Sequence, residues 1–295
     1  MDRREGPSRC PLPRTWGEGT FCIDAGGSRT MSDYENLKLE RRDHVALVTF
    51  DRPRHSNALS LDLLEELEAL CRSLATEAEL RAIVFTGSGA HFSAGADLKD
   101  VRAEQRAREP LVLRRRSLRL GQRVVQSLYD LDAITIAAIN GGALGGAAVL
   151  VTAMDFRIGG DDCFVAYPEI NLGMNLMWLG LPLCVRLVGP SRAKRMVILG
   201  HQESAPSLLD WGFLDELVPR AELVPRALAL AARYAAQPPV QAQMIKRSIN
   251  MLVSALDPAI MHMDFDQFQL ATASEDAREA REAQAERREA NYQGR

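Results

Sequence analysis

The stretch "AINGGALGGAAVLVTAMDFRIG", residues 138–159, decides the fold because it predicts a strand, a turn, a helix and a second strand in succession. It continues the apolar run Ile134–Ile139, whose lack of alternating polar residues predicts a strand buried on both faces. The run breaks at Asn140-Gly141-Gly142, and the small residues from Gly145 to Ala153 predict a fully buried helix. This succession is typical of an α/β protein.

The elements predicted on either side of this stretch place strands mainly in the first two thirds of the chain. Val45–Phe50 and Ala82–Thr86 are apolar and β-rich, and between them the leucines of residues 63–74 share one helical stripe. Residues 156–158 and 163–166 predict a pair of strands around a Gly-Gly-Asp-Asp turn. The helices predicted in the last third are one that begins after an N-cap at Ser191 and ends at Gly200, and others over residues 221–236, 239–255 and 258–289.

The chain divides into three predicted parts without a linker between the last two. Residues 1–30 are rich in Gly, Pro, Arg and Ser without hydrophobic periodicity, which predicts a disordered N-terminal extension. Met31, where regular patterning begins, is a candidate for the true start. We expect residues 31–230 to form an α/β core and residues 231–295 a helical C-terminal region.

Composition excludes several classes of function. The 295 residues are 46% hydrophobic and 25% charged, as in an ordinary globular protein, and the net charge of −3 disfavours nucleic acid as a main partner. No apolar run has the length needed to span a membrane. The five cysteines are scattered without a CxxC pair, and no His cluster completes a metal-ligand pattern, so we expect reduced thiols, a cytoplasmic location and no metal.

Three segments carry the chemistry, and each alone has two interpretations. "DRPRHSNAL" at 51–59 is by itself a strand-to-helix turn. The small residues of "FSAGADLK" at 92–99 allow a close backbone approach, either to a ligand or to another chain segment. "ALGGAA" at 143–148 opens a helix, whose free N–H groups suit either a developing oxyanion or a phosphate, although no GxGxxG or GxxxxGK spacing is present.

Together and in this order, the three segments resemble the signatures of the crotonase (enoyl-CoA hydratase/isomerase) family. A fourth segment, "YPEINLG" at 167–173, is similar to the part of the family that carries an acidic residue, and "ATASEDAREA" resembles its closing helix. The resemblance runs from about Leu37 to Tyr292. It implies a spiral of ββα units with a helical C-terminal trimerisation region, in a homotrimer or a dimer of trimers.

The resemblance also implies a site for an acyl-CoA thioester. By position, the backbone N–H groups of Ala96 and Gly146 are the expected oxyanion donors, and small side chains around them leave room for the pantetheine. Lys99, Arg52 and Arg54 are candidates for CoA phosphates, with solvated surface residues as the alternative. The remaining residues expected to line the substrate are Ser93, Ala94, Asp97, Leu98, Gly145 and Val149.

The carboxylates separate the possible reactions. Hydratases of this family use two glutamates; the later one matches Glu169, but the earlier one falls on Val149, which cannot move a proton. Dienoyl-CoA isomerases carry an acid eight residues after Glu169, where this chain has Met177. The pattern therefore favours a Δ3,Δ2-enoyl-CoA isomerase, in which one base moves a proton from C2 to C4. We expect an apolar pocket to raise the pKa of Glu169.

Two rival functions stay open. A hydratase, or another crotonase reaction, would need a replacement acid from elsewhere in the chain, and a non-catalytic protein would bind acyl-CoA without exchanging its α-protons. No cofactor is implied, because CoA arrives as part of the substrate. The expected partner is thus an acyl-CoA, with neither nucleic acid nor membrane.

Overall fold

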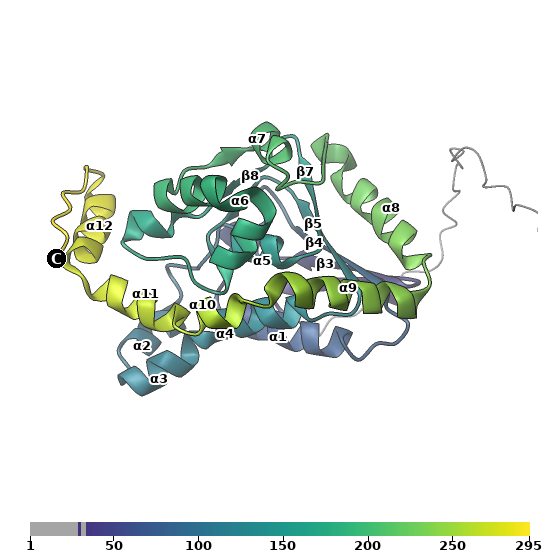
Figure 1. Ribbon diagram of the computed structural model, residues 1–295, viewed down its shortest axis with the longest axis horizontal. Helices are drawn as coiled ribbons and strands as arrows, with labels where there is room; N and C mark the ends of the chain where they lie inside the picture. Colours follow the sequence, from purple (N-terminus) through teal and green to yellow (C-terminus); the bar gives the residue numbers. More distant parts are fainter. Residues whose placement is uncertain (1–28, 31–33) are drawn as a thin grey trace, which may run out of the picture.

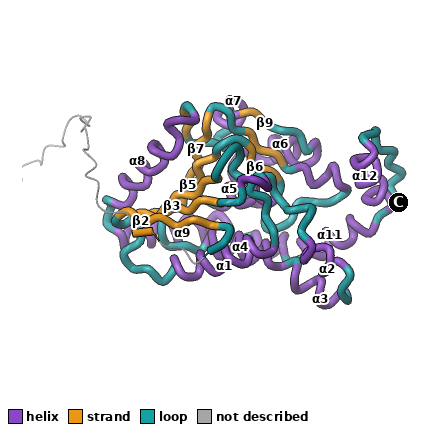
Figure 2. Tube along the Cα trace, turned by 180° about the vertical axis from the view of Figure 1, so that it is seen from behind, coloured by secondary structure: helices purple, strands orange, loops and turns teal. Residues whose placement is uncertain are grey.

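The computed structural model describes residues 29–30 and 34–295, and its centre is a twisted seven-stranded sheet (Figures 1 and 2). The first three strands are antiparallel, and the neighbours from β3 onward run parallel. In spatial order the strands are β1 (Arg29–Thr30), β2 (Leu37–Arg42), β3 (Val45–Phe50), β4 (Ala82–Gly87), β5 (Ile134–Ile139), β7 (Phe156–Gly160) and β10 (Glu216–Val218). The α/β class and the predicted strands at 45–50, 82–86 and 134–139 are confirmed.

A second, three-stranded sheet holds β6 (Gly142–Leu144), β8 (Phe164–Ala166) and β9 (Glu203–Ser204). The predicted pairing of residues 156–158 with 163–166 is therefore wrong. Both edges of β7 are already occupied by β5 and β10, so the chain turns away after β7 and β8 pairs with β6 instead. This second sheet brings residues 142–144 beside the segment that leads to Glu169.

Helices cover both faces of the large sheet. On one face α1 (Leu61–Leu74), α4 (Arg119–Tyr129), α5 (Gly146–Ala153) and α6 (Gly180–Leu199) share one apolar core with it. On the other face α8 (Leu223–Ala235) packs against β3, β4 and β5 (Figure 1). Residue 230, the expected end of the α/β core, thus lies inside a helix that covers the sheet.

The prediction for α6 is half correct. The helix ends at Gly200, whose φ of 62° forms a left-handed cap, as expected. It does not begin at Ser191, because the break inside α6 falls at Gly189, where φ is 77° and ψ 166°, and Pro190 opens the second half. Proline is favoured in the first turn of a helix because the missing N–H is not needed there.

The C-terminal region begins with α9 (Pro239–Ser254), which is bound to α4 through Tyr129 and Asn250. The single helix predicted at 258–289 is wrong, because the chain forms α10 (Asp257–Met261), α11 (Asp264–Ala273) and α12 (Glu275–Glu286). Ser274 has an extended ψ of 156° and its hydroxyl accepts a hydrogen bond from Ala277 N, so it ends α11 and caps α12. In both views α12 and the C-terminus lie at one end of the molecule.

The remaining elements are short and were not predicted from the sequence. The 3-10 turns are η1 (Pro53–His55), η2 (Pro168–Leu172) and η3 (Arg220–Glu222), and the helices are α2 (Val101–Ala107), α3 (Leu111–Ser117) and α7 (Ala205–Asp210).

The N-terminal residues are only partly described. Arg29 and Thr30, the last two residues of the expected extension, pair with Arg41 and Glu40 of β2. Residues 1–28 and 31–33, Met31 included, lie outside the described residues. Within the described part, no helix is long and apolar enough to cross a membrane.

Candidate active site

Two buried asparagines hold the loops that carry the sequence motifs. Asn57 is fully buried; its amide donates to Ser88 O and His91 O at 2.9 and 2.8 Å, and its oxygen accepts from Arg52 N. Asn140 forms the same kind of link, donating to Gly87 O at 2.9 Å and accepting from Gly87 N at 3.0 Å. These bonds fix the ends of β3, β4 and β5 relative to one another, at the carboxyl edge of the parallel sheet where α/β sites form.

Ala96 is held so that its own N–H points away from Leu59. It forms a parallel bridge with Leu59, in which Gly95 O accepts from Leu59 N and Asp97 N donates to Leu59 O. In a parallel bridge the flanking peptide groups make the bonds, so the N–H of the central residue faces the other way. Ala96 is exposed, and within residues 34–295 its N–H has no hydrogen-bond partner.

Gly146 is the first residue of α5, so its N–H has no partner within the helix. Gly145 before it donates to Ala166 O at 2.9 Å and has φ 53° and ψ −122°, a conformation that favours glycine. The helix therefore starts at a fixed point with the partial positive charge of its N-terminus at Gly146. Gly146 is half-buried, whereas Gly145 is buried.

The two loops lie against each other, which brings both free amides to one place. Ser93 N donates to Gly142 O and Leu144 N donates to Ser93 O, both at 3.1 Å. At Gly95 a Cβ would lie 2.5 Å from Leu144 O and 3.7 Å from Gly145 Cα. Only glycine fits such a contact, and its φ of 83° is left-handed as well. The arrangement can hold a partly negative oxygen between the two N–H groups.

Glu169 lies on η2, directly over the second loop. A Cβ at Gly145 would lie 2.9 Å from Glu169 Oε1, while Oε2 is buried without a partner among the described residues. Burial raises the pKa of this carboxyl from its usual 4.5 to about 7, in the direction expected from the sequence. A carboxyl with a pKa near neutrality and one free oxygen is suited to accept and return a proton.

Val149 lies one turn into α5 and belongs to the apolar core. It is 1% exposed, and its Cγ2 lies 2.9 Å from the position of a Cβ on Gly180, beside Leu176. Every residue of α5 from Ala147 to Ala153 is buried. Hydratases of the crotonase family, which these motifs resemble, carry their earlier glutamate at the position of Val149. In this chain that position is surrounded by apolar side chains.

Trp178 and Asp264 belong to the same region, and Asp264 was not assigned from the sequence as a site residue. The Trp178 ring is wedged between two glycines, with ring atoms 2.4 Å from a Cβ on Gly146 and 1.8 Å from one on Gly121. Trp178 and Leu179 both have left-handed backbones, with φ 61° and 65°. Asp264, only 3% exposed, accepts from Leu179 N at 3.3 Å and so stabilises this corner. Gly121 and Gly146 are 25 residues apart and Trp178 is farther along the chain, so a single sequence gives no sign that the three meet.

Asp264 is the second buried acid of the region. Its Oδ1 has no partner among the described residues, and burial raises its pKa to about 6. Asp264 begins α11, so a C-terminal helix contributes directly to the corner that positions Trp178.

The other predicted substrate residues fall into two groups. Arg52 and Asp97 form an ion pair at 3.0 Å, and Ser93 is fully buried, with its Oγ accepting from Gly95 N. These three side chains hold the loops together. The side chains that are exposed around the Ala96 loop are Arg54, Ala94, Leu98 and Lys99.

Comparison with known proteins settles the family. The model of the family described as "Enoyl-CoA hydratase/isomerase" matches residues 40–295. The chain belongs to the enoyl-CoA hydratase/isomerase family. Among curated members, the crotonyl-CoA hydratase of Syntrophomonas wolfei is 30% identical over 262 residues, 88% of this chain and 98% of that protein. The short-chain-enoyl-CoA hydratase of Clostridium acetobutylicum is 30% identical over 257 residues, 87% of this chain and 97% of that one.

Solved structures of the family share the fold. An enoyl-CoA hydratase from Bacillus anthracis has a TM-score of 0.70 at 29% identity, covering 88% of this chain and 100% of that chain. DspI from Pseudomonas aeruginosa has a TM-score of 0.70 at 30% identity, with 89% and 98% covered. The crotonase-like fold with a helical C-terminal region, implied by the sequence motifs, is confirmed, and the protein is an enzyme of this family. Over the described residues, no group of three or more His, Cys, Asp and Glu side chains could hold a metal ion.

Proposed function

We propose that the protein is a Δ3,Δ2-enoyl-CoA isomerase that uses Glu169 as its only acid–base group. The observation that carries this proposal is the contrast between two positions. Glu169 has a free oxygen and a pKa raised to about 7, while Val149 is enclosed by hydrocarbon. A reaction that needs a single proton shuttle fits this set, and the addition of water between two carboxylates does not.

The proposed reaction starts with a 3-enoyl-CoA whose thioester oxygen accepts hydrogen bonds from Ala96 N and Gly146 N. Glu169 removes a proton from C2, the C3–C4 double bond moves to C2–C3, and the same proton is returned to C4. Negative charge develops on the thioester oxygen in the dienolate, where two fixed N–H donors stabilise it. Removing one such donor typically costs about 2.7–4 kcal/mol of barrier.

The proposal includes the remaining requirements of the reaction. The ligand is an acyl-CoA, and no separate cofactor is needed, because no electrons are exchanged. The exposed side chains of Arg54, Leu98 and Lys99 lie next to the Ala96 loop and are proposed to meet the CoA moiety. The free thiols of Cys71, Cys163 and Cys184 are buried, which is compatible with the proposed cytoplasmic location.

Hydration is the second candidate, because the relatives named above are hydratases. It would require a replacement for the missing glutamate. Asp264 is the candidate for that role, because it is buried, has an unpartnered oxygen and supports the corner at Trp178, whose ring contacts Gly146.

Parallel assays separate the two reactions. The protein is incubated with 3-hexenoyl-CoA and with crotonyl-CoA. Isomerisation of the first ester is followed by the gain of conjugated thioester absorbance, and hydration of the second by its loss.

We expect isomerisation without comparable hydration. Glu169→Gln should isomerise about 10²–10⁴-fold more slowly than the wild type, whereas Asp264→Asn should retain isomerisation. Hydration as fast as isomerisation, or near-normal activity of Glu169→Gln, would overturn the proposal. Tight binding of both esters without turnover would favour the non-catalytic alternative.

We also propose that the protein works as a homotrimer or a dimer of trimers. The support is a set of apolar side chains on α9, on α10 and at Leu256 between them. Each is more than half exposed: Val240, Met244, Ile245, Ile249, Leu252, Leu256 and Ile260. A cavity of about 850 Å³ runs between α9 and the chain around Met154 and Leu187. Apolar side chains exposed in such a group are rare on a monomer. Light scattering is expected to give three or six chains; a monomer at micromolar concentration would contradict this.

A further inference from the structure

A second cavity, of about 350 Å³, is lined by residues of α2, α3, α11 and α12 together with Leu61, Leu118 and Met174. In Figures 1 and 2 α11 lies close to α2 and α3, and an ion pair between Arg115 and Asp266 joins α3 to α11. Helix α12 follows α11 in the chain and contributes Arg281 to the cavity. The large apolar side chains of the cavity wall are Leu61, Leu118, Met174 and Phe268, and Ala103 also lines it.

Three of these apolar residues belong to segments that also build the candidate active site. Met174 N donates to Glu169 O at 3.0 Å. Leu61 follows Leu59, which pairs with Ala96, and Leu118 lies one helical turn before Gly121, which contacts the Trp178 ring. Segments that lead from the loops of Ala96, Gly146 and Glu169 therefore also form one wall of this cavity.

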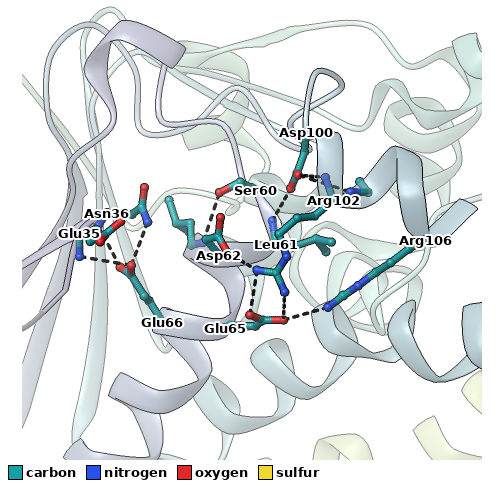
Figure 3. Close-up of polar contacts among 12 residues, drawn as sticks. Glu35, Asn36, Ser60, Leu61, Asp62, Glu65, Glu66, Asp100, Arg102 and Arg106 are labelled. Atoms are coloured by element: carbon teal, nitrogen blue, oxygen red, sulfur yellow. Dashed lines mark hydrogen bonds and ion pairs between the residues drawn. The ribbon is translucent and has the colours of Figure 1, made fainter.

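The polar part of the wall is cationic. Its charged members are Arg106, Arg114 and Arg281, its neutral polar members are Ser117, Gln269 and Thr272, and among the described residues no Asp or Glu lines it. Arg106 already has a partner, because its guanidinium lies 3.0 Å from Glu65 Oε1 (Figure 3). Arg114 and Arg281 have no ion-pair partner within residues 34–295.

Arg114 gives the second indication of a ligand. Its Nε is buried and has no hydrogen-bond acceptor among the described residues. A buried charged donor without an acceptor is costly, and a planar guanidinium is best satisfied by the two oxygens of a carboxylate or phosphate. The cavity thus combines a short apolar passage with two unneutralised guanidinium groups.

We infer that this cavity binds an anionic group, the carboxylate at the far end of a dicarboxylic acyl chain whose CoA thioester lies at Ala96 and Gly146. This deepens the proposed function and rests on it. Leu61, Leu118 and Met174 contact the methylene groups, and Arg114 and Arg281 bind the terminal carboxylate. A volume of about 350 Å³ is at the lower end of the range for small-molecule pockets, which suits a short acyl chain. CoA phosphates are the other source of an anion with the same chemistry.

The test compares two ligands that differ only at the far end. Binding of hexanoyl-CoA and of the half-thioester hexanedioyl-CoA is measured by calorimetry, and turnover of 3-hexenoyl-CoA and 3-hexenedioyl-CoA by absorbance. The variants are Arg114→Gln, Arg281→Gln and their combination. Arg116→Gln, which alters an exposed arginine of α3 that does not line the cavity, is the matched control.

We expect the double variant to bind hexanedioyl-CoA about 10–100-fold more weakly, with hexanoyl-CoA and the Arg116 control within about threefold of the wild type. Equal weakening of both esters and of free CoA would assign the arginines to CoA phosphates and overturn the acyl assignment. Unchanged binding of all ligands would overturn the anion site. Because binding needs no turnover, an absent isomerase reaction with these binding differences intact would contradict the proposed function alone.

Discussion

Helix α5 and turn η2 both border the candidate site, and they differ in whether they carry an ionisable side chain there. The residues of α5 from Ala147 to Ala153 are all buried, and Val149 packs against Leu176 and the backbone of Gly180. The turn η2 is five residues long and keeps Glu169 half-buried, with a pKa of about 7. A helix sealed in the core offers no room for a second acid with water, so the proposed proton chemistry is assigned to the turn.

The turn is held from outside the core, by the C-terminal region. A Cβ on Gly173 would lie 2.3 Å from Ala277 Cα, so α12 packs directly on the end of η2. Glu169, the proposed base, is thus positioned in part by α12, whereas Gly146, the proposed oxyanion donor, begins a helix that is buried in the core.

Placing a carboxylate on α5 gives the largest expected effect. Val149→Glu buries a charge among Leu176 and the core of α5, and we expect a loss of about 3–5 kcal/mol in the free energy of unfolding at pH 8, measured with urea. Val149→Gln has the same shape without the charge and should lose less, about 1–3 kcal/mol. If Val149→Glu were as stable as the wild type and hydrated crotonyl-CoA, position 149 would be open to water and the contrast with η2 would fail.

Disturbing the other oxyanion loop comes next. Gly95→Ala places a Cβ 2.5 Å from Leu144 O, so the N–H of Ala96 must shift, and we expect kcat/KM to fall about 10²–10³-fold. Gly212→Ala is the control, since Gly212 has a similar φ of 75° with nothing within 4 Å of the added Cβ. Both variants lose about 1 kcal/mol or more of stability through left-handed backbone strain, and only Gly95→Ala should lose activity. If Gly95→Ala and Gly212→Ala had equal kcat/KM, the Ala96 loop would have no role in the reaction.

The smallest effect concerns the proton on Glu169. The base is active when ionised, so kcat should rise with pH to a plateau above about pH 7. The contribution of Glu169 to the free energy of unfolding changes with pH in the opposite direction. Between pH 4.5 and 7 the native carboxyl holds a proton that the unfolded chain has released, so stability falls as pH rises, by at most about 3 kcal/mol. Urea unfolding of wild type and Glu169→Gln from pH 5 to 8 isolates this contribution, because Asp264 titrates in both; parallel curves would contradict the raised pKa.

The sequence was sufficient for the features that depend on local patterns. The unbroken apolar run of β5, the small residues of α5 and the leucine stripe of α1 each identify their element, because burial on both faces or on one stripe determines the composition. The four motifs in order identified the family. They also marked Ala96, Gly146 and Glu169, which the structure brings around two touching loops.

Features that depend on distant segments were missed or wrong. Residues 156–158 and 163–166 are both good strands, but only the sheet order shows that β7 has no free edge. The wedge of Trp178 between Gly121 and Gly146, and the support from Asp264, join three parts of the chain that no periodicity connects. The arginine-lined cavity likewise needs residues of α3 and of α12 to line one hollow, whereas in the sequence both are simply charged helices.

The central claim is that Glu169 alone removes the proton from C2 of a thioester held by Ala96 and Gly146. Exchange of the α-protons of hexanoyl-CoA in D₂O, followed by proton NMR, tests this without depending on the later fate of the enolate. We predict exchange by the wild type, at least about 10²-fold slower exchange by Glu169→Gln, and near-wild-type exchange by Asp264→Asn. Exchange by Glu169→Gln at the wild-type rate would contradict the account.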